Sequence, residues 1–418
     1  MSLLHPASAA TAYSTGFLPD ERDYTVRSIL GKASRAGSDI GEVLATVASV
    51  PEKDHQAWFD AWIALGRRIH GIADHSAAAG HRVSAARAYL RAANYFAVAM
   101  DGIDSLDDGE AELLPTFRAH RAAWDGFVST TPWDAEPVAI AYEDDSLPGY
   151  LFRPDASGAP RPTLVLVNGS DSALSGLWCG AAEGGLQRGY NVLLFDGPGQ
   201  QSMLFERKVP FRPDWAPVLT SVVDYLLARS DVDGSRLAGY AISQGGYWLP
   251  QALATENRFA AAIADGGVVD VGRSWTSNIP HPVLAAYLKG DTAKFDSEMK
   301  FGFELPGGKK AAQTWAFRAR PYGGSTAGGY AATLDEVLKY DLTGVAGKIT
   351  TPLYITDSAD EQFFPGQSKE LAALVAGSVL VEFTAEEGAR FHCQPTAREL
   401  TEQRMYDWLD ETIANRST

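Results

Sequence analysis

The chain has 418 residues, enough for one large domain and a smaller one, since single hydrophobic cores seldom grow beyond about 250 to 300 residues. Its composition, 45% hydrophobic and 11% aromatic, provides material for a sizeable core and argues against a disordered protein. The net charge of -16 argues against a nucleic-acid partner, because binding to phosphates depends on clustered Lys and Arg. A small-molecule substrate is the partner that we expect.

The N-terminal segment MSLLHPASAATAYSTGF has neither a basic n-region nor a long apolar stretch, so it is not expected to be a signal peptide. No apolar run approaches the roughly 20 residues that cross a bilayer, which argues against a membrane protein. The two cysteines, Cys179 and Cys393, follow no metal-ligand spacing. A reduced, cytoplasmic compartment fits them best, although they leave room for one disulfide.

Residues from about 51 to 127 have helical periodicity. Apolar residues recur three or four positions apart at Trp58, Trp62, Leu65, Ile69 and Ile72. A second, alanine-rich helix is expected over about 80–100, and a third after the chain break at 107–109. Residues 1–131 are therefore predicted to form an N-terminal helical cap domain.

Beyond residue 131 short apolar runs alternate with helical stretches. A hairpin is expected over 138–152, turning at Leu147-Pro148-Gly149. Further strands are expected at 163–167, 191–195, 236–242, 260–264, 353–356 and 379–383. This alternation predicts an α/β fold for residues 132–418, with a mostly parallel sheet flanked by helices.

A long segment with little strand character, about 270–350, interrupts this alternation. It exceeds any ordinary loop, so it is expected to contain helices and to form a lid over the site. The aromatic residues Trp275 and Trp315 of this segment, with Trp58 and Trp62 of the first domain, favour an aromatic substrate. For Trp58 and Trp62, packing in the core is the more ordinary interpretation of their helical spacing.

The strand expected at 236–242 leads into Ser243, which is followed by Gln244-Gly245-Gly246 and a helical stretch. A nucleophile elbow requires this order, with small residues two positions before and after the serine. Ala241 and Gly245 meet that requirement. A serine in a merely structural turn is the commoner interpretation of so short a motif, but the strand and the helix around it favour a nucleophile.

A serine nucleophile needs a histidine base, which follows the acid in α/β hydrolases. His281 lies at the start of the predicted lid, whereas His392 follows the last expected strand, so His392 is the predicted base. For the acid, Asp360 is predicted because a short turn after the strand at 353–356 would aim its carboxylate. Asp357 is the second choice and Glu361 the third.

Two main-chain amides are expected to stabilise the oxyanion, one after the nucleophile and one after the third strand. The sequence places them at Gln244 and at Ser170, within Asn168-Gly169-Ser170-Asp171. The same four residues are also good turn formers, and the two interpretations are compatible.

Five motifs in order carry a resemblance to a known family: NGSDSALSGLW, QRGYNVLLFDGPGQ, FRPDWAPVLTSVVDYLLARSDVD, AISQGGYWLP and EEGARFHCQ. Over most of its length the chain resembles the α/β-hydrolase family that contains 2,6-dihydroxypseudooxynicotine hydrolase and the fungal polyketide-shortening hydrolases of the yellowish-green pigment type. The resemblance implies an α/β-hydrolase fold, a serine triad, N-terminal helices that cap the active site and, often, a homodimer.

Some members of that family cleave a carbon-carbon bond beside a ketone, and others are esterases or resemble peptidases. Asp171 matches an acidic residue that is thought to assist the carbon-carbon hydrolases. The chain departs from the family at Ala241, usually glycine, and at Gln201, where glycine usually follows GPGQ.

The expected function is carbon-carbon bond or ester hydrolysis of an aromatic or polyketide-like small molecule. An acyltransferase or cyclase, a peptidase-like or amidase-like hydrolase, and a non-catalytic binding protein remain alternatives. No metal is expected, because the histidines lack ligand spacing. No nucleotide cofactor is expected either, since Gly197-Pro198-Gly199 lacks the full glycine-rich pattern.

Overall fold

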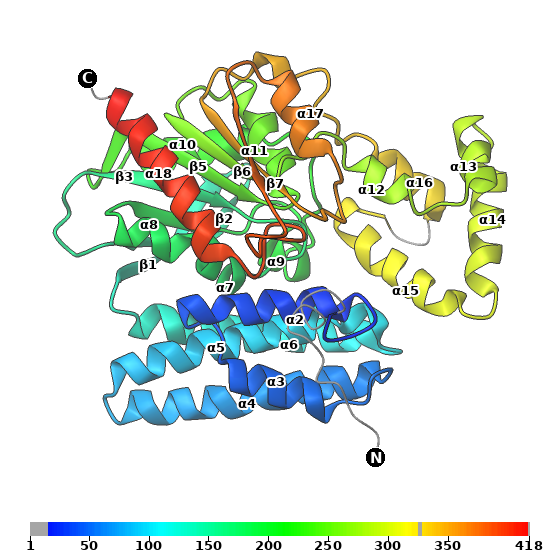
Figure 1. The fold of residues 1–418 in the computed structure, drawn as a ribbon, viewed down its shortest axis with the longest axis horizontal. Helices are drawn as coiled ribbons and strands as arrows, with labels where there is room; N and C mark the ends of the chain where they lie inside the picture. The colour runs from blue at the N-terminus through cyan, green and yellow to red at the C-terminus, as the bar shows by residue number, and fades with distance from the viewer. Residues whose placement is uncertain (1–15, 325–327, 417–418) are drawn as a thin grey trace.

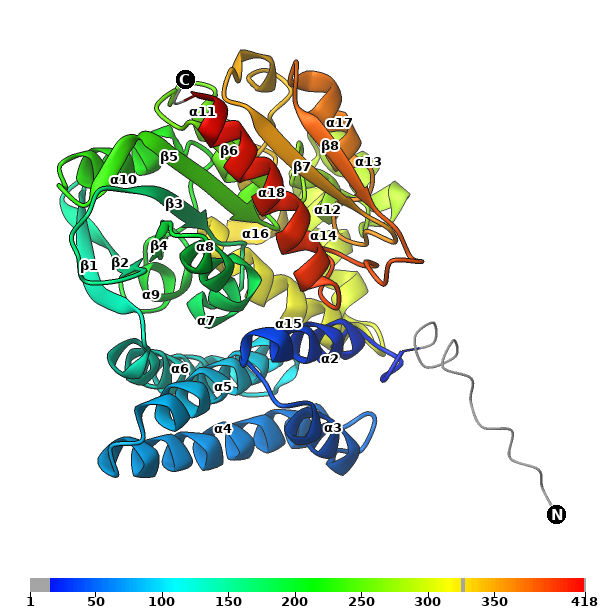
Figure 2. The ribbon, with the colours of Figure 1, turned by 60° about the vertical axis from the view of Figure 1, so that its left-hand side comes forward.

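The computed structural model describes residues 16–324 and 328–416, in which a layer of N-terminal helices lies against a larger region built on a twisted sheet (Figure 1). The two layers keep this arrangement in the turned view of Figure 2. The segment between the sixth and seventh strands forms a helical extension at the side of the sheet and reaches the N-terminal helices (Figure 1).

The N-terminal helical layer packs around buried aromatic side chains. It consists of α2 (Arg22–Gly31), η1 (Lys32–Arg35), α3 (Ile40–Ser49), α4 (His55–Ala78), α5 (Arg82–Asp101), η2 (Ile103–Ser105) and α6 (Gly109–Thr130). Trp58 and Trp62 are buried on α4, with ring centroids 5.4 Å apart, in the core position that their spacing predicts. Ile72 is 45% exposed, so it does not continue this stripe. Ala73 does so instead, because it lies one helical turn beyond Ile69.

The sheet has eight strands in the order β1-β2-β4-β3-β5-β6-β7-β8 within the described residues. The strands are β1 (Asp134–Tyr142), β2 (Asp145–Arg153), β3 (Arg161–Val167), β4 (Asn191–Phe195), β5 (Val232–Ile242), β6 (Ala261–Asp265), β7 (Leu353–Ser358) and β8 (Val379–Phe383). The hairpin β1–β2 is antiparallel and joins β4 in antiparallel register, whereas β4, β3, β5, β6, β7 and β8 pair in parallel.

The hairpin turns at a different place from the one expected. Leu147-Pro148-Gly149 lies within β2, and the turn joins Tyr142 to Asp145 through Glu143, whose φ is 49°. Gly149 does not form the turn. It allows β2 to lie close to β4, since a Cβ there would lie 2.7 Å from the main-chain oxygen of Leu194 on β4.

Helices cover both faces of the sheet. They are α7 (Leu174–Leu177), η3 (Trp178–Ala182), α8 (Glu183–Gln187), α9 (Gln201–Phe205), α10 (Ala216–Leu227), α11 (Gly245–Leu253), α17 (Gln367–Leu374) and α18 (Arg398–Arg416). Leu164 and Leu166 of β3 belong to one core cluster, with α8 and α18, while Val165 and Val167 belong to a second cluster, with α10 and α11. This is the α/β-hydrolase fold that the sequence predicts.

The β6–β7 segment (residues 266–352) contains helices of its own, as its length predicts. They are α12 (Gly272–Thr276), α13 (His281–Leu288), α14 (Thr292–Glu304), α15 (Gly308–Ala319), η4 (Arg320–Tyr322), α16 (Gly329–Val337) and η6 (Ala346–Lys348). Figure 1 shows α13 and α14 extending away from the sheet, with α15 returning toward the N-terminal helical layer. No helix among the described residues is both long enough and apolar enough to cross a membrane.

Candidate active site

Ser243 occupies a sharp turn between β5 and α11. Its φ of 58° is left-handed, a conformation that costs a non-glycine residue roughly 1 to 2 kcal/mol. Its N–H donates to the main-chain oxygen of Asp265 over 2.7 Å, which fixes the turn to the end of β6. A Cβ at Gly246 would lie 1.9 Å from the main-chain oxygen of Gly266, and one at Gly245 would lie 2.8 Å from that of Val167. The elbow therefore requires both glycines.

His392 lies beside Ser243, as the chain order predicts. Its Nε2 is 2.8 Å from the Ser243 Oγ, and the residue is only 4% exposed. The rings of Phe363 and Phe364 flank the imidazole, with centroids at 5.0 and 5.7 Å. The serine hydroxyl and the imidazole thus form a hydrogen-bonded pair that is shielded from bulk water.

The carboxylate on the other side of the imidazole belongs to Glu361 and not to Asp360. Glu361 Oε2 lies 2.8 Å from His392 Nδ1, and Glu361 Oε1 accepts from the N–H groups of Phe363 and Phe364. Asp360 has a left-handed φ of 58° and is paired with Arg390 at 2.5 Å. Asp360 therefore does not reach the imidazole as predicted, because its left-handed backbone and its pair with Arg390 leave the next residue, Glu361, facing His392.

The remaining acid candidate, Asp357, is also away from the imidazole. Its carboxylate lies 3.4 Å from the ammonium of Lys369. Of the three candidate carboxylates, Asp357 at the end of β7 and Asp360 and Glu361 after it, the structure therefore brings only Glu361 to His392.

His392 and Glu361 each favour the charged form of the other. Burial alone would lower the pKa of His392, but Cys393 and the carboxylate of Glu361 raise it well above its ordinary value. Burial would likewise raise the pKa of Glu361, yet the imidazole and the amides of Phe364 and Phe363 hold it below its ordinary value. Burial also raises the pKa of the Cys393 thiol, and where that thiol is protonated the carboxylate of Glu361 is the charge that raises the pKa of His392.

The loop after β3 closely approaches the serine. A Cβ at Gly169 would lie 3.3 Å from the Ser243 Oγ, so glycine keeps space open there. Gln200, which the sequence interpretation did not single out, holds this loop by donating from Nε2 to the main-chain oxygen of Asn168 over 2.9 Å. Within the described part of the chain, the main-chain N–H groups of Ser170 and Gln244 donate no hydrogen bond. Both amides are free to donate to a ligand.

Asp171 follows that loop with an exposed side chain, and its main-chain oxygen accepts from Gln201 Nε2 over 3.2 Å. Burial and the charge of Asp171 raise the pKa of Asp101 on α5 to about 7, partly offset by Lys32. Asp171 is therefore within electrostatic range of the N-terminal helical layer.

A buried ion pair below the elbow was not anticipated from the sequence. Asp265, at the end of β6, accepts from Arg398 Nη1 at 2.7 Å, from the Tyr240 hydroxyl at 2.8 Å and from the Thr356 hydroxyl at 2.8 Å. Arg398 Nη1 also donates to the main-chain oxygen of Cys393 over 2.9 Å. The pair thus links the β6 end, which holds Ser243, to the loop that carries His392.

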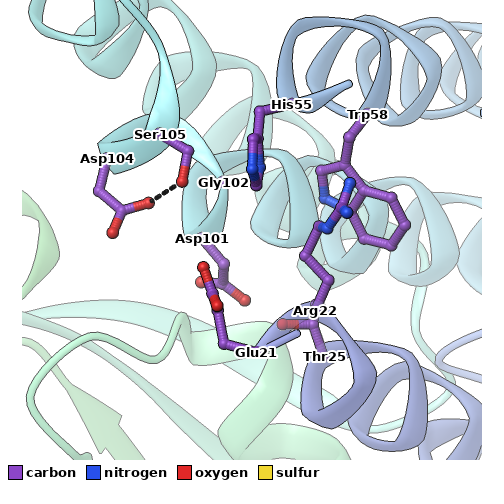
Figure 3. A pocket seen from close by; sticks show the side chains of 9 residues that line it. All are labelled: Glu21, Arg22, Thr25, His55, Trp58, Asp101, Gly102, Asp104 and Ser105. Carbon is purple, nitrogen blue, oxygen red and sulfur yellow. Dashed lines mark hydrogen bonds between the residues drawn. The ribbon is translucent and has the colours of Figure 1, made fainter. Parts of the chain in front are cut away.

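A cavity of about 70 Å³ lies among the helices of the N-terminal layer (Figure 3). It is lined by Glu21, Arg22, Thr25, His55, Trp58, Asp101, Gly102, Asp104 and Ser105. Of the residues that the sequence links to catalysis or the substrate, only Trp58 lines it, and none of the predicted catalytic or oxyanion residues does. The cavity is also far smaller than the roughly 300 to 1,000 Å³ of ordinary small-molecule sites. The groups around Ser243 are therefore the better candidate for the substrate site.

Helix α15 of the β6–β7 segment is attached to the N-terminal helical layer next to this cavity. Thr314 Oγ1 donates to Asp104 at 2.8 Å, and Gln313 Nε2 donates to the main-chain oxygen of Leu106 at 2.9 Å. Ion pairs join Lys309 to Asp107, Lys310 to Glu21 and Arg320 to Glu110. The segment and the helical layer therefore contact each other directly.

The fold and this arrangement define the class of the protein as α/β hydrolase. All the groups around Ser243 come from loops at the carboxyl ends of β3, β5, β6, β7 and β8, the edge where open α/β sheets bind ligands. Among the described residues, no group of three or more His, Cys, Asp or Glu side chains is placed to hold a metal ion.

Comparison with known proteins gives the particular family. The chain is 30% identical over 412 residues to Hydrolase LUC6 of Fusarium sp, covering 93% of this chain and 95% of that protein. It is 27% identical over 426 residues to 20-hydroxy-prefusarin hydrolase FUS2 of Gibberella moniliformis, covering 95% and 98% of the two chains. The chain belongs to the α/β-hydrolase family of these fungal enzymes.

Two further comparisons agree on the fold. The crystal structure of 2,6-dihydroxy-pseudo-oxynicotine hydrolase superposes with a TM-score of 0.71 at 19% identity, covering 92% of this chain and 95% of the other. Residues 186–296 match the prolyl oligopeptidase family. The fold class that the sequence predicts is thereby confirmed, and the chain is a hydrolase.

Proposed function

We propose that this hydrolase acts through a serine triad in which Ser243 is the nucleophile, His392 the general base and Glu361 the acid that orients it. The observation that carries the proposal is the 2.8 Å separation of the Ser243 Oγ and His392 Nε2, with Glu361 2.8 Å from Nδ1. A neutral imidazole with Nδ1–H bonded to a carboxylate presents its Nε2 lone pair to the hydroxyl, as proton abstraction requires.

In the first step His392 takes the proton of Ser243 while the oxygen attacks a substrate carbonyl. The oxyanion that forms is stabilised by the amides of Gln244 and Ser170, whose proposed role is supported by the closeness of the loop after β3. The bond from the carbonyl carbon to its leaving group then breaks, and the imidazolium returns its proton to that group. Water, activated by the same imidazole, hydrolyses the acyl-enzyme and restores the serine.

The proposed substrate is an aromatic or polyketide-like small molecule cleaved at an ester or at a carbon-carbon bond beside a ketone. A carbon leaving group must depart as an enolate, and Asp171 is proposed to assist its protonation. The relative FUS2 is named for hydrolysis of 20-hydroxy-prefusarin, which supports a small-molecule substrate. Trp275 and Trp315, in edge-to-face contact at 5.0 Å, add aromatic surface to the β6–β7 segment.

A fluorophosphonate probe tests the triad without knowledge of the substrate, because it reacts with activated serines. The wild-type protein is expected to be labelled at Ser243, and Ser243→Ala is expected to abolish labelling. Ser235→Ala is the matched control, since Ser235 is an exposed serine on β5 whose hydroxyl donates to Asp233. Failure of the wild-type protein to react, or labelling at another residue, would overturn the proposal.

A peptidase-like or amidase-like activity is the second candidate, favoured by the match of residues 186–296 to the prolyl oligopeptidase family. Acyl transfer or cyclisation is a third outcome of the same acyl-enzyme. A screen of aryl-ketone, ester and peptide substrates in ¹⁸O-labelled water separates them. Hydrolysis places the label in the carboxylate product, whereas transfer or cyclisation gives an unlabelled product.

The proposal extends to a homodimer in a reduced, cytoplasmic compartment. The family resemblance supports the dimer, and the two free, buried cysteines Cys179 and Cys393 are compatible with a reduced compartment. Light scattering of the purified protein measures its mass against the 44.9 kDa of one chain.

A further inference from the structure

The loop that carries His392 has an unusual backbone. Phe391, Cys393 and Gln394 have φ values of 69°, 56° and 44°, so three of four consecutive residues are left-handed without being glycine. Each such residue costs of order 1 kcal/mol or more and persists only where the surroundings hold it. The position of the imidazole therefore depends on what packs against this loop.

From inside the sheet region, the loop is held by the buried pair below the elbow. Arg398 donates to the main-chain oxygen of Cys393, and the Cys393 Sγ lies 3.2 Å from the main-chain oxygen of Asp265. These contacts fix the residue after His392.

From outside, the loop is held by helix α2 of the N-terminal layer. The Tyr24 hydroxyl donates to the main-chain oxygen of His392 over 2.9 Å. The Tyr24 ring meets Phe363 edge to face at 5.6 Å, and Phe363 in turn meets the imidazole at 5.0 Å. One side chain thus reaches His392 by two routes, through its backbone and through the ring that flanks its imidazole.

Two further contacts show how closely α2 is fitted to this loop. The guanidinium of Arg27 lies over the Phe391 ring, 4.8 Å from its centroid. A Cβ at Gly31 would lie only 1.7 Å from the main-chain oxygen of Pro395, so the helix backbone approaches the loop as closely as glycine permits. The end of α2 is therefore seated on the loop after His392.

We infer that Tyr24 is a positioning residue for the proposed general base, and that helix α2 of the N-terminal layer is part of the catalytic machinery rather than only a cover over it. The inference rests on the proposed function of His392. Tyr24 touches no reacting atom in this proposal; its hydroxyl and ring hold the imidazole where Nε2 meets Ser243 and Nδ1 meets Glu361.

The phenol keeps its proton throughout the working pH range. Burial, with the nearby Cys393, Glu361, Asp171 and Asp265, raises the pKa of Tyr24 well above its ordinary value. The hydrogen bond to His392 is therefore not itself titrated, and any change in the pH profile of a variant reports on the imidazole.

Tyr24→Phe tests the inference, because it removes one oxygen and keeps the ring against Phe363. The rate of fluorophosphonate labelling is expected to fall about five- to tenfold, the effect of one hydrogen bond. The midpoint of its pH profile is expected to move down toward about 6.5, the ordinary pKa of histidine, as the imidazole loses alignment with Glu361. Tyr89→Phe is the matched control, since its hydroxyl lies on α5 and bonds Asp74 at 2.7 Å.

Two outcomes would overturn the inference. One is labelling of Tyr24→Phe at the wild-type rate at every pH. The other is a slower rate with an unmoved midpoint, accompanied by the same loss of thermal stability as in Tyr89→Phe, which would indicate a purely structural hydroxyl. An unreactive wild-type protein is a different result, because it contradicts the triad itself.

Discussion

Glu361, in the turn after β7, and His392, in the loop after β8, form a buried hydrogen-bonded pair at 2.8 Å, while the adjacent Asp360 pairs with Arg390 on the outside. The side chains of His392 and Glu361 are 5% and 11% exposed, whereas that of Asp360 is 50% exposed. Asp360 therefore faces solvent while Glu361 is buried, and only Glu361 contacts the imidazole.

Glu361→Gln is therefore expected to lower the labelling rate by about 10³ to 10⁴-fold, because the amide no longer fixes the tautomer or the charge of the imidazole. Asp360→Asn removes only an exposed pair with Arg390, so its rate is expected to stay within about twofold of wild type. The measurement is the second-order rate constant with a fluorophosphonate. A large loss in Asp360→Asn, with Glu361→Gln active, would assign the acid to Asp360 instead.

The sequence was sufficient to predict the sheet but not which carboxylate lies beside His392. Apolar runs bounded by turns predicted β4 and β8 with their observed bounds. β4 is buried along its whole length, whereas β8, at the edge of the sheet, is mostly half-buried or exposed and was recognised from its short apolar run. No such pattern distinguishes Asp360 from Glu361. The choice depends on a left-handed φ at Asp360, which no glycine marks in the sequence, and on the bridge between Ala359 and Arg390, which are far apart along the chain.

Helix α2 was missed for a similar reason. Its buried face includes Arg22 and Arg27 beside Val26 and Ile29, so no apolar stripe marks it. Those arginines pair with Asp20 and Asp23, and nothing in the sequence indicates that the helix buries the two charged side chains. Tyr24, on the same helix, was consequently not considered for the site.

The pH dependence of labelling follows from the imidazole. Its pKa is raised above the ordinary 6.5, and only the neutral form accepts the serine proton, so the rate is lost as pH falls through that raised pKa. We expect a wild-type midpoint above 6.5. In Glu361→Gln the residual rate is expected to have a lower midpoint, because the negative charge that favours the imidazolium is gone. A wild-type midpoint at or below about 6.5 would contradict this account.

Loss of one partner of the buried pair Asp265–Arg398 is expected to lower the free energy of unfolding substantially. Arg398→Met leaves the carboxylate of Asp265, which is fully buried, without its cation, and removal of one partner of such a pair costs about 3 to 5 kcal/mol. In the double variant with Asp265→Asn, the amide is neutral, so part of that loss is expected to be recovered. Urea unfolding of both variants measures this. Equal losses in the single and double variants would show that the charge is not the cause.

Opening of the site is expected to depend on the contact between α15 and the N-terminal helical layer. The charged links such as Lys309 with Asp107 are exposed and individually weak, so the part-buried hydrogen bonds of Gln313 and Thr314 should matter more. Gln313→Ala combined with Thr314→Val removes both and shifts the segment toward open forms.

Labelling of that double variant by a bulky aryl fluorophosphonate is expected to quicken by up to about thirtyfold relative to a small dialkyl probe, since two hydrogen bonds of about 1 kcal/mol each no longer oppose opening. Thr343→Val is the matched control, because its hydroxyl bonds Asp341 within the β6–β7 segment and does not contact the helical layer. If the ratio of the two labelling rates were the same in all three proteins, access to Ser243 would not pass between α15 and the helical layer.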